Sequence, residues 1–162
     1  MRGIFRLLLI CTFLYSSFAS RYGVNVDDDN MSPEDILELA DEALSTNDPI
    51  GALKIYEQGI EKINEEEDSL VTALSLYTNA GTAYSSTGDE RKAVGMYRKA
   101  ILLFSKQIDE IVEESVQKSA TEITAQAAFF LGMTHEALES YRKAADSYAF
   151  AASLDSYHWA GM

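Results

Sequence analysis

The stretch Tyr77-Thr78-Asn79-Ala80-Gly81-Thr82-Ala83-Tyr84, followed by Gly88-Asp89, decides the fold of this chain. Tyr77, Gly81 and Tyr84 are spaced by four and three residues, which places them on one face of a helix. The Gly-Asp dipeptide then predicts a turn. Beyond the turn, Ala93, Tyr97 and Ala100 resume the helical spacing. The stretch therefore predicts two helices joined by a tight turn.

Two further copies of this pattern lie on either side of the stretch. The first contains Ile36, Leu39, Ala40, Ala43, Asn47-Asp48, Ala52, Tyr56 and Gly59, and the third contains Ala128, Leu131, Gly132, His135, Ala144, Tyr148 and Ala151. Small residues in each first helix are expected to let the two helices of a pair approach, while the tyrosine of each second helix fills the gap between successive pairs. We therefore predict an all-α fold, a solenoid of about three helix-turn-helix pairs.

The pattern resembles the tetratricopeptide repeat over about residues 32–158. The usual repeat has about 34 residues, whereas Ala52 and Ala93 are 41 residues apart and Ala93 and Ala144 are 51 apart. The chain is thus more similar to long-helix variants, such as those of kinesin light chains and soluble attachment proteins. We expect the extra length to extend the second helix of the middle copy from Glu90 to about Lys118.

The first 19 residues have the pattern of a secretory signal peptide. Arg2 and Arg6 flank the start of the apolar run Leu7–Leu14, and Ala19 is a small residue of the kind that precedes a cleavage site. Cleavage is expected after Ala19, which predicts localisation to the secretory pathway, either secreted or in the lumen of an organelle such as the endoplasmic reticulum. The alternatives are a buried N-terminal helix and a signal anchor. If the signal is cleaved, we expect no stable membrane span in the remaining chain.

Two short segments flank the predicted repeat domain. Residues 20–31 are expected to form an acidic linker, in which Asn30 begins an N-glycosylation triplet, so we predict a glycoprotein. At the other end, residues 159–162 are either a tail or the start of a truncated further repeat. An uncapped last pair would leave Phe150, Leu154 and Trp159 as an apolar patch, which predicts self-association or a continuing array. The alternative is that the aromatic tail folds back and caps this end.

Composition and motifs disfavour several classes of function. The chain of 162 residues has a formal net charge of -13, so it offers no basic stripe to a nucleic acid. It has one cysteine, Cys11, and two histidines, His135 and His158. No phosphate loop and no metal-binding helix motif occurs, and we expect His135 to be a satisfied, semi-buried imidazole. The sequence therefore predicts no enzyme, no cofactor and no metal site.

In the tetratricopeptide family, the first helices of the pairs form the concave, ligand-binding face, which we call the first-helix face. The resemblance implies a protein or peptide partner with a basic or apolar segment, because this face is acidic in the first copy, polar in the second and apolar in the third. An alternative is that the apolar residues belong only to the core. The predicted contact residues are Leu37, Asp41, Leu44, Asn79, Thr82, Ser85, Phe129, Phe130 and Met133.

Chaperone-tail receptors of the same family hold a terminal carboxylate with cations and asparagine. Only Asn79 matches that pattern here, so the charge of the face contradicts such a clamp. The predicted function is a non-catalytic protein-interaction scaffold of the secretory pathway. Two alternatives stay open, namely the N-terminal scaffold fragment of a longer enzyme or receptor, and a lumenal cochaperone.

Overall fold

The computed structural model describes residues 31–64 and 69–160, with side chains as far as Leu154 in the last helix. The predicted signal peptide, its cleavage site, the glycosylation site at Asn30 and nearly all of the linker lie outside the described residues. Residues from Ser32 onward form one compact unit, and the fold is described within it.

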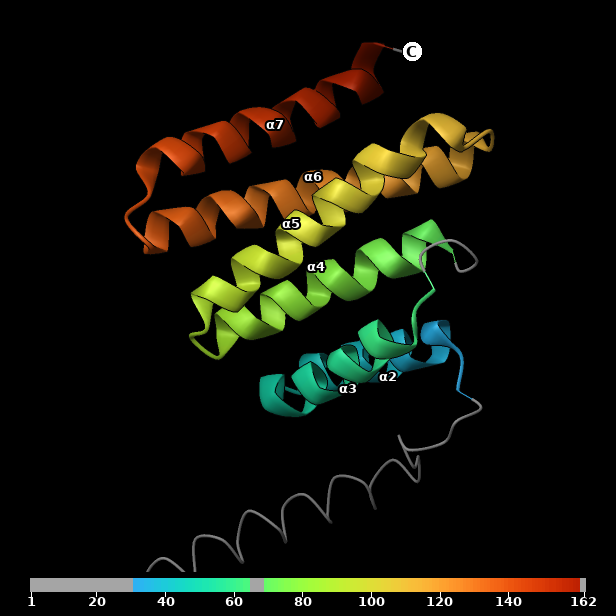
Figure 1. The fold of residues 1–162 in the computed structure, drawn as a ribbon, viewed down its shortest axis with the longest axis vertical. Helices are drawn as coiled ribbons and strands as arrows, with labels where there is room; N and C mark the ends of the chain where they lie inside the picture. The colour runs from blue at the N-terminus through green and yellow to red at the C-terminus, as the bar shows by residue number, and fades with distance from the viewer. Residues whose placement is uncertain (1–30, 65–68, 161–162) are drawn as a thin grey trace, which may run out of the picture. The chain divides into compact units, whose positions relative to one another are not determined.

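Six α-helices follow one another in the described part of this unit, and no strand occurs there. They pack as three pairs stacked in chain order, which confirms the predicted all-α helical-repeat solenoid (Figure 1). Among the described residues, no helix combines the length and the apolarity needed to cross a membrane. The helices are α2 Pro33–Ser45, α3 Pro49–Lys62, α4 Leu70–Ser86, α5 Glu90–Gln107, α6 Glu114–Ala137 and α7 Tyr141–Ala160, with the 3-10 turn η1 Ile108–Glu110 after α5.

Side-chain caps fix where the helices α2, α3 and α5 begin. Ser32 caps α2 in a capping box, since its hydroxyl accepts a hydrogen bond from the Asp35 N–H while the Asp35 carboxylate accepts one from the Ser32 N–H. Asp48 and Asp89 cap α3 and α5 by accepting hydrogen bonds from backbone N–H groups three residues further on. These acidic caps satisfy N–H groups that a helix start leaves without partners.

The first helix of every pair ends in the same left-handed turn. Asn47, Gly88 and Glu139 have φ angles of 63°, 83° and 55°. In each turn the next residue's N–H reaches a carbonyl five residues back, as in the 2.8 Å bond from Ser140 N–H to His135 O. Glycine adopts this conformation without steric cost, whereas glutamate does not. The residue types alone therefore do not predict the third turn.

Within two of the pairs, a tyrosine ring lies directly on a glycine. A Cβ atom on Gly81 would be 2.6 Å from Tyr97 Cε1, and a Cβ atom on Gly132 would be 2.5 Å from Tyr148 Cε1. The prediction that these small residues permit close helix approach is therefore confirmed. The predicted place of the tyrosines needs correction, because the rings of Tyr97 and Tyr148 fill the gap inside their own pairs. Tyr97 also lies near Phe130 of the following pair.

The predicted long second helix of the middle copy is wrong. α5 ends at Gln107, η1 follows, and extended backbone at Ile111 and Glu113 breaks the path before α6 begins. The apolar stripe that suggested one continuous helix is real, but it continues across the break. The extra residues lie in the 24-residue α6 and in the connection before it, so Lys118 belongs to a first helix.

The end of the last helix also differs from the prediction. We expected it near Asp155-Ser156, but α7 continues to Ala160. Leu154 is buried in the hydrophobic core and Phe150 packs against it, so these two do not form the exposed patch predicted for the end of the array. The side chain of Trp159 lies outside the described ones.

Candidate protein-binding face

All nine predicted contact residues lie on α2, α4 and α6, the first helices of the three pairs. Their exposure differs along the solenoid. Asp41 is exposed on α2, Phe129 and Met133 are 50% and 49% exposed on α6, and the α4 residues are only partly exposed. Leu37, Leu44, Asn79, Thr82, Ser85 and Phe130 are the half-buried members of the set.

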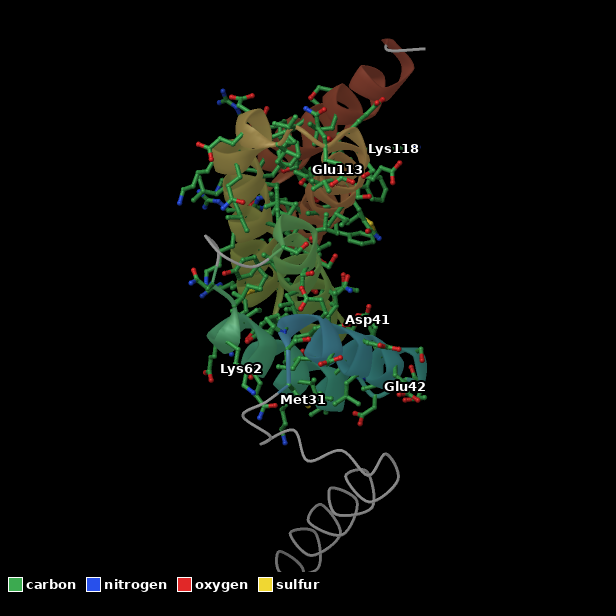
Figure 2. The ribbon with its side chains drawn as sticks, turned by 90° about the vertical axis from the view of Figure 1, so that its right-hand side faces the viewer. Met31, Asp41, Glu42, Lys62, Glu113 and Lys118 are labelled. Atoms are coloured by element: carbon green, nitrogen blue, oxygen red, sulfur yellow. The ribbon has the colours of Figure 1, made fainter. Side chains whose placement is uncertain are left out.

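Asp41 joins the first pair to the second. Its Oδ1 accepts a hydrogen bond from the hydroxyl of Tyr56 in α3 and another, 2.8 Å long, from Nδ2 of Asn79 in α4. Burial, with the Asp41 carboxylate beside it, raises the pKa of Tyr56 well above its usual value, so this hydroxyl keeps its proton and remains a donor. Figure 2 shows Asp41 and its neighbour Glu42 at the edge of α2. Because Asn79 donates to Asp41, its amide serves the junction rather than a carboxylate clamp.

The polar residues of α4 have internal partners as well. The Thr82 hydroxyl donates to the Thr78 carbonyl and lies 3.3 Å from the Tyr97 hydroxyl. Ser85 donates a 2.9 Å hydrogen bond to Glu90 Oε2. These bonds fix the side chains, so a partner that passes over α4 meets an ordered polar surface.

The three apolar residues of α6 are divided between two surroundings. Phe130 points toward the middle pair, where its ring centroid is 6.1 Å from that of Tyr97. Phe129 instead lies 5.4 Å from the ring of Tyr148 in α7. Met133 is half exposed. The alternative that all three residues belong only to the core therefore fits Phe130 alone. Phe129 and Met133 remain accessible to a partner.

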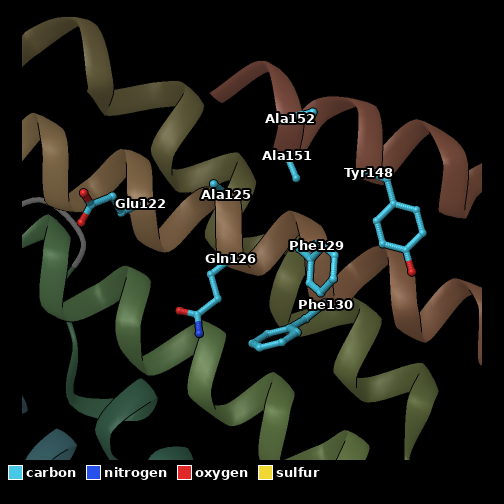
Figure 3. A pocket seen from close by; sticks show the side chains of 8 residues that line it. All are labelled: Glu122, Ala125, Gln126, Phe129, Phe130, Tyr148, Ala151 and Ala152. Carbon is cyan, nitrogen blue, oxygen red and sulfur yellow. The ribbon is translucent and has the colours of Figure 1, made fainter. Parts of the chain in front are cut away.

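An open apolar groove of about 650 Å³ lies between α6 and α7, and sequence analysis did not identify it (Figure 3). Phe129, Phe130 and Tyr148 supply the aromatic part of its lining, and alanines supply the floor. The signal that could have found it is the run of alanines in both helices. The lining residues are Glu122, Ala125, Gln126, Phe129, Phe130, Tyr148, Ala151 and Ala152.

His135 is buried, as expected, but it is not satisfied. Its Nδ1 has no hydrogen-bond partner, and burial lowers the pKa of the imidazole, with Lys143 and Arg98 adding to the shift. The described residues contain no group of three histidine, cysteine or acidic side chains that could hold a metal ion. His135 is therefore not part of such a metal-binding group in the described part of the chain.

The comparisons with known proteins bear on the middle pair. No curated protein sequence and no solved structure matches the chain significantly. Residues 74–107 match the tetratricopeptide repeat family model, a segment that corresponds to most of α4 and all of α5. Tetratricopeptide repeats generally mediate protein–protein interactions and are typically non-catalytic. The middle helix pair is therefore similar to a tetratricopeptide repeat.

Proposed function

We propose that the protein is a non-catalytic interaction scaffold that binds a peptide segment of a partner protein across the first-helix face. The observation that carries the proposal is the placement of all nine contact residues on α2, α4 and α6, in a chain whose middle pair matches a protein-binding repeat. The nine residues span the first helices of three successive pairs, so an extended segment suits them better than a small molecule.

The chemistry of the face defines the segment it favours. Asp41 presents a carboxylate at the α2 end, whereas Met133 presents an exposed thioether at the α6 end. Both hydrogen bonds to Asp41 end on Oδ1, and a carboxylate has acceptor capacity on both oxygens. We infer that a basic residue of the partner binds near Asp41 and that an apolar residue lies near Met133.

This proposal is tested with labelled peptides that combine a basic and an apolar residue at variable spacing. The decisive variant is Asp41→Asn, which removes the charge but retains an acceptor for Tyr56 and Asn79. The matched control is Glu42→Gln, which removes the same charge from the neighbouring position. Fluorescence anisotropy should show weaker binding for Asp41→Asn only, with an affinity that falls as salt rises. Equal losses in the two variants, or a preference for acidic peptides, would refute the proposal.

We also propose that the scaffold acts in the secretory pathway. The support is the pattern Arg2, Leu7–Leu14 and Ala19, together with the glycosylation triplet at Asn30. N-terminal sequencing of the protein from a eukaryotic host should begin at Ser20, and glycosidase treatment should reduce its mass. Recovery of Met1 from a soluble cytosolic pool would contradict this localisation without affecting the proposed binding face.

A further inference from the structure

The groove between α6 and α7 occupies the same place in the third pair as surfaces that are covered in the first two. Ala40, Gly81 and Gly132 are equivalent, because Tyr56, Tyr97 and Tyr148 each follow sixteen residues later. In the same register, Phe129 and Ala151 of the groove correspond to Thr78 and Ala100 of the middle pair.

In each earlier pair, this surface is covered by the first helix of the next pair. α4 packs on α2 and α3, and α6 packs on α4 and α5. From α4, Thr72 donates to Glu34, Leu76 lies over Gly59, and Asn79 donates to Asp41. The equivalent residues of α6 are Ile123, Ala127 and Phe130. The residues by which a covering helix contacts the preceding pair are therefore spaced i, i+4 and i+7.

The covered and uncovered surfaces differ in exposure. Thr78 and Tyr97 are 1% and 2% exposed beneath α6, whereas Phe129 is 50% exposed in the groove. Figure 3 shows Phe129 and Tyr148 facing each other there, with Ala151 and Ala152 on α7. Among the described residues, no helix packs on the groove as α4 and α6 pack on the earlier pairs.

Phe129 also limits the size of the side chain that a covering helix could place beside Tyr148. At the second junction, the aromatic neighbour of Tyr97 is Phe130, supplied by the covering helix. In the third pair, the aromatic neighbour of Tyr148 is Phe129, supplied by the pair itself. A covering helix that carried a large ring at i+7 would compete with Phe129 for this space. A small residue at i+7 is therefore complementary.

The opposite end of the solenoid excludes a head-to-tail second copy. On α2, the residues equivalent to Leu76 and Asn79 are Asp35 and Glu38, and both are exposed. Placing these carboxylates against the groove would remove them from water without a partner charge. Among the described residues, α2 thus presents a polar surface, whereas the groove between α6 and α7 is apolar.

The margin of the groove is acidic. Glu122 is an exposed lining residue, and Glu136 accepts a 2.8 Å hydrogen bond from the Tyr148 hydroxyl. These two carboxylates lie on α6 on opposite sides of Phe129 in the sequence, so basic residues at the ends of a bound helix would complement them. Charge and shape thus both define the occupant.

We propose that the α6–α7 groove binds an amphipathic helix of a partner protein, with apolar residues at i and i+4, a small residue at i+7 and basic flanks. This helix extends the stack as α4 and α6 do within the chain. Phe129 and Phe130 belong to both surfaces. The inference does not rest on the proposed function of the first-helix face, because Tyr148, Ala151 and Ala152 of α7 line only the groove.

Two stapled helical peptides test the proposal, both with isoleucine at i, leucine at i+4 and lysine at the ends. One has alanine at i+7 and the other has phenylalanine. The wild-type protein should bind the alanine peptide at least about fivefold more tightly in fluorescence anisotropy, and Phe129→Thr, which reproduces Thr78, should reverse the preference. Equal affinity for the two peptides in both proteins would overturn the size argument.

A second pair of variants checks the location. Ala152 and Ala149 are both exposed on α7, but only Ala152 lines the groove. Ala152→Trp should weaken the alanine peptide about tenfold or more, whereas Ala149→Trp and Asp41→Asn should leave it unchanged. Equal effects of the two tryptophans would overturn the site. Sedimentation showing a dimer that Ala152→Trp dissociates would assign the groove to a second copy and overturn the partner helix.

Discussion

Replacement of Gly81 by alanine tests the packing on which each helix pair depends. The new Cβ atom would lie 2.6, 2.8 and 2.9 Å from three ring carbons of Tyr97, whereas carbon atoms in good contact are about 3.5–4.0 Å apart. The ring would have to move by about 1 Å. Its hydroxyl lies beside Thr82 and its face lies near Phe130, so the ring has little free space in which to move.

The magnitude follows from comparison with Gly95, a second glycine in the same helix pair. Gly95 is exposed in α5, and a Cβ atom there would meet nothing within 4 Å. Both substitutions gain the same helix propensity, up to about 1 kcal/mol. Only Gly81→Ala also incurs overpacking, which costs about 1–3 kcal/mol. The difference between the two variants therefore isolates the clash and should be about 1–3 kcal/mol.

Urea and thermal unfolding followed by circular dichroism measure this difference. Gly95→Ala should unfold at or above the wild-type temperature, and Gly81→Ala should unfold roughly 3–15 °C below Gly95→Ala. Tyr97→Leu in the Gly81→Ala background should recover part of the loss, because it removes the ring that the methyl group meets. Equal stability of the two alanine variants would refute the packing of Tyr97 on Gly81.

Two further predictions concern a strained turn and a buried tyrosine. Glu139→Gly should raise the free energy of unfolding by about 0.5–1 kcal/mol, since it relieves the left-handed backbone at φ 55°; no gain in urea denaturation would argue against strain there. Burial and the Glu57 carboxylate raise the pKa of Tyr84 to about 12, so its contribution to stability is full below about pH 10 and is lost as the pH rises to 12. Urea titrations at several pH values should therefore show a shallower alkaline loss for Tyr84→Phe than for wild type, and parallel curves would exclude this role.

The repeated residues predicted the number and pairing of the helices because they are constrained by contact. Gly81 and Gly132 have no side chain where a tyrosine ring must fit, and Asp89 caps the helix that carries one of those rings. Such residues leave a periodic pattern in the sequence. The end of α5 leaves none, because the segment after Gln107 keeps its apolar spacing and contains neither glycine nor proline. The prediction of one long helix failed for that reason.

The candidate site was predictable to the level of a helix face and no further. The register placed Asp41, Thr82 and Met133 on first helices, as found. It could not show that Asp41 already accepts two hydrogen bonds, or that Phe129 and Phe130 have different surroundings. These properties depend on contacts between helices that are separated in the sequence, such as those of Asn79 with Asp41 and of Phe130 with Tyr97.

The neighbours of the repeated tyrosines differ between the helix pairs. The hydroxyl of Tyr56 donates to a carboxylate, whereas that of Tyr97 lies beside the uncharged Thr82 and its ring lies near Phe130. The repeat pattern requires the tyrosine ring in each case but leaves its neighbours free to vary. On the first-helix face, the exposed residues change from the acidic Asp41 on α2 to the apolar Phe129 and Met133 on α6. A partner segment with one basic and one apolar end should therefore bind in a single orientation, which paired labels on the peptide and on α2 would report by energy transfer.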